Sequence, residues 1–186
     1  MIATGRRGRY GGGMNELLVP TPGEIWLLHT PPREAMLSLV ARMALSGPLL
    51  ALDAANEFDA YRVARLIRGQ TRHLDRTLSR VRVARAFTCY QVVALFEQLP
   101  ATPVPHIVFD LPATFYDESV TTGESRRLLR VVLDHVERLR RNAPMVISVR
   151  PARGGRRTEL LQAVIDTADH LFAWESPSAP DPVKLF

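Results

Sequence analysis

The sequence predicts an α/β fold with a mostly parallel central sheet and helices on both of its faces. Short apolar runs alternate with amphipathic segments along the chain, which is the rhythm of consecutive β–α–β units. The runs 49–52, 106–109 and 145–149 are apolar at most positions, as is typical of strands buried on both faces. The 186 residues suffice for one domain with a substantial core.

The N-terminal half alternates regularly between the two kinds of element. Residues 24–29 form a short apolar run after a Pro-Gly turn and predict a strand. Residues 34–45 place apolar side chains on one helical face until a Gly-Pro pair breaks the pattern. The run 49–52 predicts a buried strand, the spacing over 59–73 predicts a helix, and the alternation over 80–85 predicts a strand.

The C-terminal half continues this alternation. Helices are expected over 90–99, 124–141 and 158–167, and strands at 106–109, 145–149 and 171–174, with a further edge strand at 183–186. Hydroxyl side chains precede two of the helices. Thr121 or Thr122 is expected to cap the helix over 124–141, and Thr158 the helix that starts there.

The ends and the charge of the chain suggest a polyanionic partner. Residues 1–13 are basic and glycine-rich, which predicts a flexible tail before a single domain over 14–186. The tail is either a dispensable leader or an arm whose arginines contact phosphates while Tyr10 stacks on a base. A net charge of +5 favours a nucleic acid, although an arginine-preferring genome would also enrich this residue type.

Cysteine and histidine usage excludes several kinds of site. Cys89 is the sole cysteine, so no internal disulfide is possible; a cytoplasmic location and a core position are expected. The five histidines lack metal-ligand spacing, so no metal site is expected. No apolar run approaches the roughly 20 residues of a membrane helix, and no membrane partner is expected.

Four stretches follow one another in an informative order. They are Gly23-Glu24-Ile25, residues 52–58 (LDAANEF), residues 83–91 (VARAFTCYQ) and residues 106–113 (HIVFDLPA). Their order and spacing resemble the core of RecA-like recombinase ATPases, especially the archaeal and eukaryotic type, over about residues 22–175. This resemblance implies a RecA-like, P-loop-NTPase-type three-layer sandwich. It also places Asp110 at the Walker B position.

The chain departs from this family where ATP would react. The phosphate loop would occupy residues 29–36, but this segment has neither glycine nor lysine, and Lys184 is the sole lysine of the chain. Ala55 stands where the family has its water-activating glutamate, and Glu57, two residues away, should point elsewhere. The sequence therefore predicts a pseudo-ATPase with no catalytic residues and no cofactor, in which Asp110 is a vestige.

The two strand-end carboxylates have a structural interpretation as well. Asp53 and Asp110 would then accept N–H groups from the turn or helix that follows each strand.

The family binds DNA through two loops, which correspond to residues 117–127 and 150–157. The second loop holds four arginines around a Gly-Gly pair and is the stronger candidate, although a solvated turn is the alternative interpretation. About four phosphate contacts would give a log–log salt slope near −3 on single-stranded DNA. The predicted nucleic-acid-binding residues are Arg150, Arg153, Arg156, Arg157, Arg126 and Arg127.

Two functions remain open. The first is a non-catalytic RecA-like paralog that assists DNA recombination or repair, binding DNA, expected to be single-stranded, and a RecA-family recombinase or another paralog. The alternative is a protein-interaction regulator that resembles the SOS cell-division inhibitors and binds no DNA. An enzyme with a ligand other than ATP finds no support in any motif. Self-association is left open, but residues 1–21 lack the family's F-x-x-A linker peptide.

Overall fold

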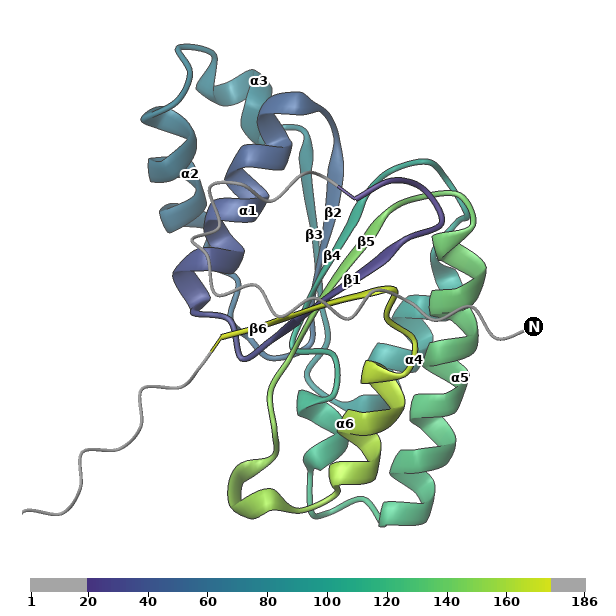
Figure 1. Cartoon of the computed structure of the whole chain (residues 1–186). Helices are drawn as coiled ribbons and strands as arrows, with labels where there is room; N and C mark the ends of the chain where they lie inside the picture. The colour runs from purple at the N-terminus through teal and green to yellow at the C-terminus, as the bar shows by residue number, and fades with distance from the viewer. Residues whose placement is uncertain (1–19, 175–186) are drawn as a thin grey trace, which may run out of the picture.

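Six parallel strands form one sheet, which lies between two layers of helices (Figure 1). The strands are β1 (Ile25–His29), β2 (Leu49–Asp53), β3 (Val81–Arg85), β4 (His106–Phe109), β5 (Met145–Val149) and β6 (His170–Ala173). This computed structural model describes residues 20–174. The tail predicted for residues 1–13 and the strand predicted at 183–186 lie outside the described residues.

The strand order is β3-β2-β4-β5-β1-β6. It differs from the order 3-2-1-4-5-6 of the dinucleotide-binding Rossmann fold. Here β5 lies between β1 and β4, with Ile25 beside Met145 and His106 beside the same residue from the other side. All strands are parallel, so their carboxyl ends meet at one edge of the sheet.

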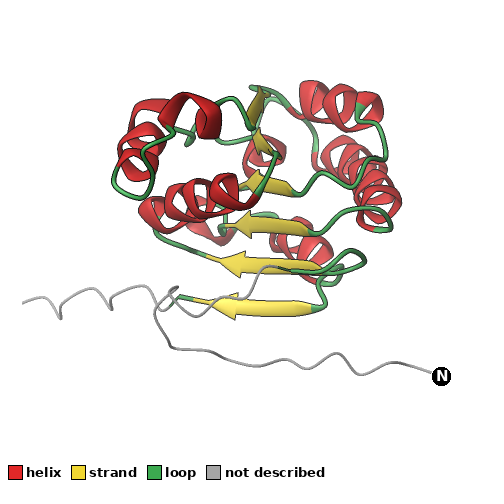
Figure 2. Cartoon of the chain, turned by 90° about the horizontal axis from the view of Figure 1, so that it is seen from above, coloured by secondary structure: helices red, strands yellow, loops and turns green. Residues whose placement is uncertain are grey.

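Helices cover both faces of the sheet (Figure 2). They are α1 (Arg33–Ser46), α2 (Ala60–Arg68), α3 (Leu74–Leu78), α4 (Cys89–Gln98), α5 (Thr122–Arg140) and α6 (Thr158–Ile165), with two 3-10 turns, η2 (Ala113–Tyr116) and η3 (Arg153–Gly155). Among residues 20–174, no helix combines the length and apolar character needed to cross a membrane.

Alternating strand residues build a separate core on each face. Leu52, Val108 and Ile147 pack against α4, α5 and α6, whereas Ala51 and Ile107 pack against α1 and α2. Because successive strand residues point to opposite faces, the apolar runs of the central strands supply both cores. The predicted two-sided burial of these strands is confirmed.

Two sequence predictions about the helices are wrong. The helix expected over 59–73 ends at Arg68. The Gly69 N–H still bonds to the Arg65 carbonyl, but the Gln70 N–H bonds to the Ile67 carbonyl three residues back, and a separate short helix, α3, follows. Thr158 does not cap α6; the cap position is Arg157, which has left-handed backbone angles and no capping side-chain bond. The Thr121 cap of α5 is confirmed, since its hydroxyl accepts the Glu124 N–H.

Candidate functional site

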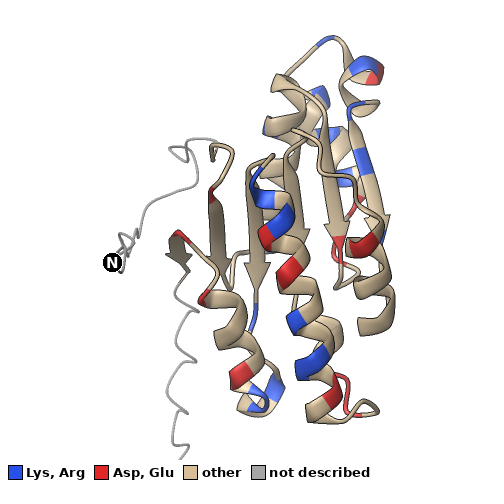
Figure 3. Cartoon of the chain, turned by 90° about the vertical axis from the view of Figure 1, so that its right-hand side faces the viewer, with Lys and Arg blue, Asp and Glu red and all other residues tan. Residues whose placement is uncertain are grey.

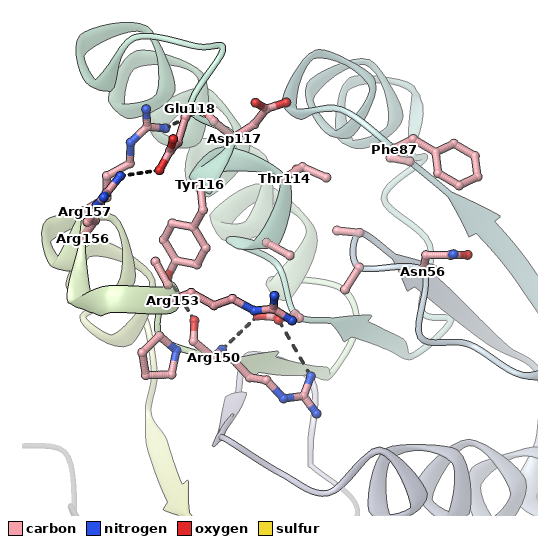
Figure 4. A pocket seen from close by; sticks show the side chains of 17 residues that line it. Asn56, Phe87, Thr114, Tyr116, Asp117, Glu118, Arg150, Arg153, Arg156 and Arg157 are labelled. Atoms are coloured by element: carbon pink, nitrogen blue, oxygen red, sulfur yellow. Dashed lines mark hydrogen bonds and ion pairs between the residues drawn. The ribbon is translucent and has the colours of Figure 1, made fainter.

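A pocket of about 740 Å³ lies outside the carboxyl ends of β2, β3, β4 and β5 (Figure 4). Its lining comes from the segments 54–56, 86–87, 110–118 and 150–157, and we call it the carboxyl-edge pocket. After β2 the chain turns to α2 on one face, whereas after the neighbouring β4 it turns to α5 on the other. The loops therefore diverge, which creates the kind of crevice where ligands bind in open α/β sheets.

Asp110 is the buried carboxylate of this pocket. It follows β4 with a positive φ of 41° and is 7% exposed. Its Oδ1 accepts the Arg150 backbone N–H at 2.9 Å, and its Oδ2 lies 3.8 Å from the Arg150 guanidinium. Burial raises the pKa of Asp110 to about 6, although Arg150 acts in the opposite direction.

The Arg150 side chain binds other parts of the protein. Its Nη1 lies 2.5 Å from Glu57 Oε1, and its Nη2 donates to the Pro31 carbonyl at 2.7 Å. Glu57 was expected to point elsewhere, but its carboxylate reaches this cluster through Arg150. The predicted DNA contact Arg150 thus joins β5, the segment after β2 and the β1–α1 loop.

The β1–α1 loop has little room for phosphates. Only Thr30, Pro31 and Pro32 separate the end of β1 from the start of α1. Thr30 has a positive φ of 51°, and its hydroxyl donates to the Trp174 carbonyl. A triphosphate cradle needs several backbone N–H groups and a cation aimed at the phosphates. This loop instead presents the Pro31 carbonyl, which already accepts from Arg150.

Asp53 has the structural role that the sequence suggested. Its carboxylate accepts the backbone N–H groups of Ala55, Glu57 and Phe58 at 2.9 to 3.3 Å. It also pairs with Arg85 at 2.9 Å and is fully buried. Asp53 therefore shapes the loop that forms one wall of the carboxyl-edge pocket.

The other arginines of loop 150–157 differ sharply in their surroundings. Arg157 donates to three carbonyls, those of Phe115, Asp117 and Val120, and to the Ser125 hydroxyl. These bonds hold the two predicted DNA-binding loops together.

Arg156 and Arg153 are the exposed arginines of this loop. Arg156 pairs with Glu118 at a highly exposed position, so water competes with this pair and it holds the side chain weakly. The Arg153 side chain extends over the pocket and has no hydrogen-bond or ion-pair partner among the described residues (Figure 4).

Arg126 and Arg127 lie in the first turns of α5 and are more than half exposed. Arg127 makes two bonds to Glu124, which lower the pKa of that carboxyl, and Arg126 lies 3.5 Å from Glu159 on α6. Both basic and acidic side chains occur along α5 (Figure 3). Surface pairs of this kind contribute little to stability, so both guanidinium groups can exchange a carboxylate for a phosphate.

Two aromatic residues at this edge were missed by the sequence reasoning. Phe87 lines the carboxyl-edge pocket and is 65% exposed, and Tyr90, one helical turn later on α4, is 53% exposed. Both lie in the ARAF-like stretch that carried the family resemblance. The sequence could have indicated both residues, because they lie just before and just after the start of the predicted helix. Side chains at such a position project from the edge of the sheet.

Cys89, between these two aromatics, is buried as expected of a core residue, and burial raises the pKa of its thiol. Within residues 20–174, no three His, Cys, Asp or Glu side chains are grouped so as to hold a metal ion.

No family model matches the chain, and no curated protein matches it in sequence. Interpretation of the site therefore rests on its geometry.

Proposed function

We propose that this chain is a non-catalytic RecA-like paralog, an accessory factor in DNA recombination or repair that binds single-stranded DNA without nucleotide hydrolysis. The observation that carries the proposal is Arg153, an unpartnered guanidinium over a pocket at the ligand-binding edge of the sheet. Guanidinium groups present forked donors that suit phosphate oxygens.

The RecA-like assignment is supported by where the four resembling stretches lie. They fall at β1, at the end of β2, across β3 and the start of α4, and at β4 with Asp110. The β1–α1 loop and Asp110 share the carboxyl edge, with β5 between their strands.

The pseudo-ATPase part is supported by Arg150. Its bonds to the Pro31 carbonyl and to Glu57 bring a protein cation to the segment where the family cradles phosphates. A RecA-family recombinase or another paralog is the protein partner we propose.

We propose a smaller set of DNA-contacting arginines than the sequence suggested. Arg150 and Arg157 are engaged inside the protein, which leaves Arg153 and Arg156 in the loop and Arg126 and Arg127 on α5. Each phosphate contact contributes about 0.7 to the log–log salt slope on single strands. Replacing Arg153 and Arg156 by alanine is therefore expected to reduce the slope by about 1.4.

Fluorescence anisotropy with a labelled single strand tests this proposal. Arg72→Ala with Arg76→Ala is the charge-matched control, because these exposed arginines lie just before α3 and within it, and α3 leads into the amino end of β3, away from the carboxyl edge. The proposal requires the Arg153/Arg156 variant to lose affinity and salt dependence while the control retains both. Equal losses in the two variants would show that only net charge matters.

One observation favours the alternative function, a protein-interaction regulator that binds no DNA. Five of the six predicted contact arginines have partners within the protein, and acidic residues such as Asp117 and Glu118 share the same edge. The same titration decides between the two, since this function predicts no DNA binding even at low salt.

A further inference from the structure

The carboxyl-edge pocket has the size and walls of a small-molecule site. Its volume of about 740 Å³ falls within the range of roughly 300–1,000 Å³ that is typical of ligand pockets. Five alanines line it, Ala54, Ala55, Ala86, Ala113 and Ala152, and their short side chains leave the space open. Walls made of methyl groups are apolar and low in relief, which suits a planar ring.

Three of the four arginines that line the pocket are bound by other groups of the protein. Asp110 faces Arg150, Glu118 pairs with Arg156, and Arg157 is bound to backbone carbonyls. Asp117 accepts the Ser119 N–H at the rim. Arg153 remains as a single forked donor, which matches one phosphate group better than a chain of three.

Two further side chains offer contacts that the protein itself does not use. Phe87 is 65% exposed at the wall formed after β3, so its ring face is open to a second aromatic ring. The Thr114 hydroxyl is buried with no hydrogen-bond partner, and Thr114 also lines the pocket. Because no bond fixes this hydroxyl, rotation about χ1 can direct it to a ligand.

A phosphate donor, a methyl-lined wall, an exposed ring and a free hydroxyl together match the parts of a nucleotide. We propose that the carboxyl-edge pocket binds one nucleoside monophosphate unit, with its phosphate at Arg153 and its base on the alanine wall beside Phe87, whose exposed ring points outward (Figure 4) and turns about χ1 to stack on the base. The unit comes either from a single strand, in which case the inference rests on the proposed function, or from a free nucleotide.

Calorimetric titration of the full chain with AMP, ribose 5-phosphate and adenosine tests this site. AMP is expected to bind at least tenfold more tightly than either fragment, because each fragment lacks one of the two anchors. Arg153→Ala and Phe87→Ala are each expected to weaken AMP binding about tenfold or more. Tyr61→Ala is the matched control for Phe87, since Tyr61 is 74% exposed and does not line the pocket.

Thr114→Val separates a ligand contact from a structural role. Valine keeps the shape of threonine and removes a buried hydroxyl that has no partner, so the melting temperature should stay the same or rise. Binding of AMP should nevertheless weaken. Equal affinity of AMP and ribose 5-phosphate, or unchanged AMP binding in both Phe87→Ala and Thr114→Val, would overturn the proposed site.

The same variants distinguish the two sources of the nucleotide unit. If Phe87→Ala weakens binding of both AMP and a single strand, the pocket holds a unit of the strand. If Phe87→Ala weakens AMP binding and the wild type binds no DNA, the pocket is a site for a free nucleotide and the proposed function fails. If DNA binding depends on Arg153 but AMP does not bind and Phe87→Ala has no effect, the proposed function stands and the pocket inference fails.

Discussion

Replacing Arg157, one of the predicted DNA contacts, by alanine should destabilise the folded protein. The Arg157 guanidinium donates to the carbonyls of Phe115, Asp117 and Val120 and to the Ser125 hydroxyl. Three of these four acceptors lie in partly buried surroundings, and Ser125 is fully buried. Alanine would remove the arginine donor from the Phe115 and Val120 carbonyls and from the Ser125 hydroxyl, whereas the Asp117 carbonyl would keep the Val120 N–H.

The magnitude follows from those three partly buried acceptors. A hydrogen bond contributes about 1 kcal/mol net, and a buried acceptor left alone costs about 1–3 kcal/mol. Arg157→Ala is therefore expected to lower the free energy of unfolding by about 3 kcal/mol or more. Urea denaturation followed by circular dichroism measures this loss, and the m-value should stay constant because the surface exposed on unfolding hardly changes.

Arg153→Ala and Arg157→Lys are the matched comparisons. Arg153 has no partner among the described residues, so its replacement should change stability by less than about 0.5 kcal/mol. Lysine at 157 keeps the charge but not the fork, and should lose about half of the stabilisation. An Arg157→Ala protein as stable as the wild type would refute the structural role assigned to this residue.

Three further predictions concern the buried ionisable groups. The pKa of Asp110 is about 6 in the folded protein and 3.8 is its ordinary value, so the native state binds more protons between these pH values. The contribution of Asp110 to stability should therefore fall by about 3 kcal/mol as pH rises from 4 to 7. In urea titrations the difference in stability between the wild type and Asp110→Asn should change by this amount over that range. Burial lowers the pKa of His106 from 6.5 to about 4, so the contribution of His106 to stability depends on pH in the opposite direction. About 3 kcal/mol of stability is lost as pH falls from 6.5 to 4. A His106→Gln protein that kept the full acid sensitivity would contradict the lowered pKa of His106. Arg150→Ala should move the pKa of Asp110 above 6, because an attractive charge is removed, and carboxyl NMR titration would show an unchanged value if the Arg150 guanidinium does not influence Asp110.

The regular elements could be predicted well because each carries its own pattern. The strand at 106–109 and the strand at 145–149 were predicted to the residue, since each is a short, mostly apolar run with a proline directly before it and a charged residue directly after it. The helix over 59–73 was extended too far because its arginine spacing continues past Gly69. The helix ends where the Gln70 N–H bonds to the carbonyl three residues back and not four, a change of hydrogen-bond partner that periodicity does not report.

The candidate site was harder to predict, since its side chains meet only through the topology. Arginine spacing in residues 150–157 identified the loop but could not separate Arg157, which is held by carbonyls some 30 to 40 positions earlier, from Arg153, which is not. The contact between Glu57 and Arg150 likewise joins residues 93 positions apart. The sequence pattern gives the residue types of a loop. The hydrogen-bond partners of those residues depend on which strands lie side by side in the sheet.

The most direct test of the account is anisotropy of a labelled single strand against the wild type and the Arg153/Arg156 double alanine variant. Both should be measured at two salt concentrations, with and without Mg-ATP. The account predicts wild-type binding that weakens with salt, ignores ATP and falls in the variant. The central claim is that Arg153, an unpartnered arginine at the carboxyl edge, contacts the strand without any need for ATP. Binding that requires ATP, or that is the same in both proteins, would contradict this claim.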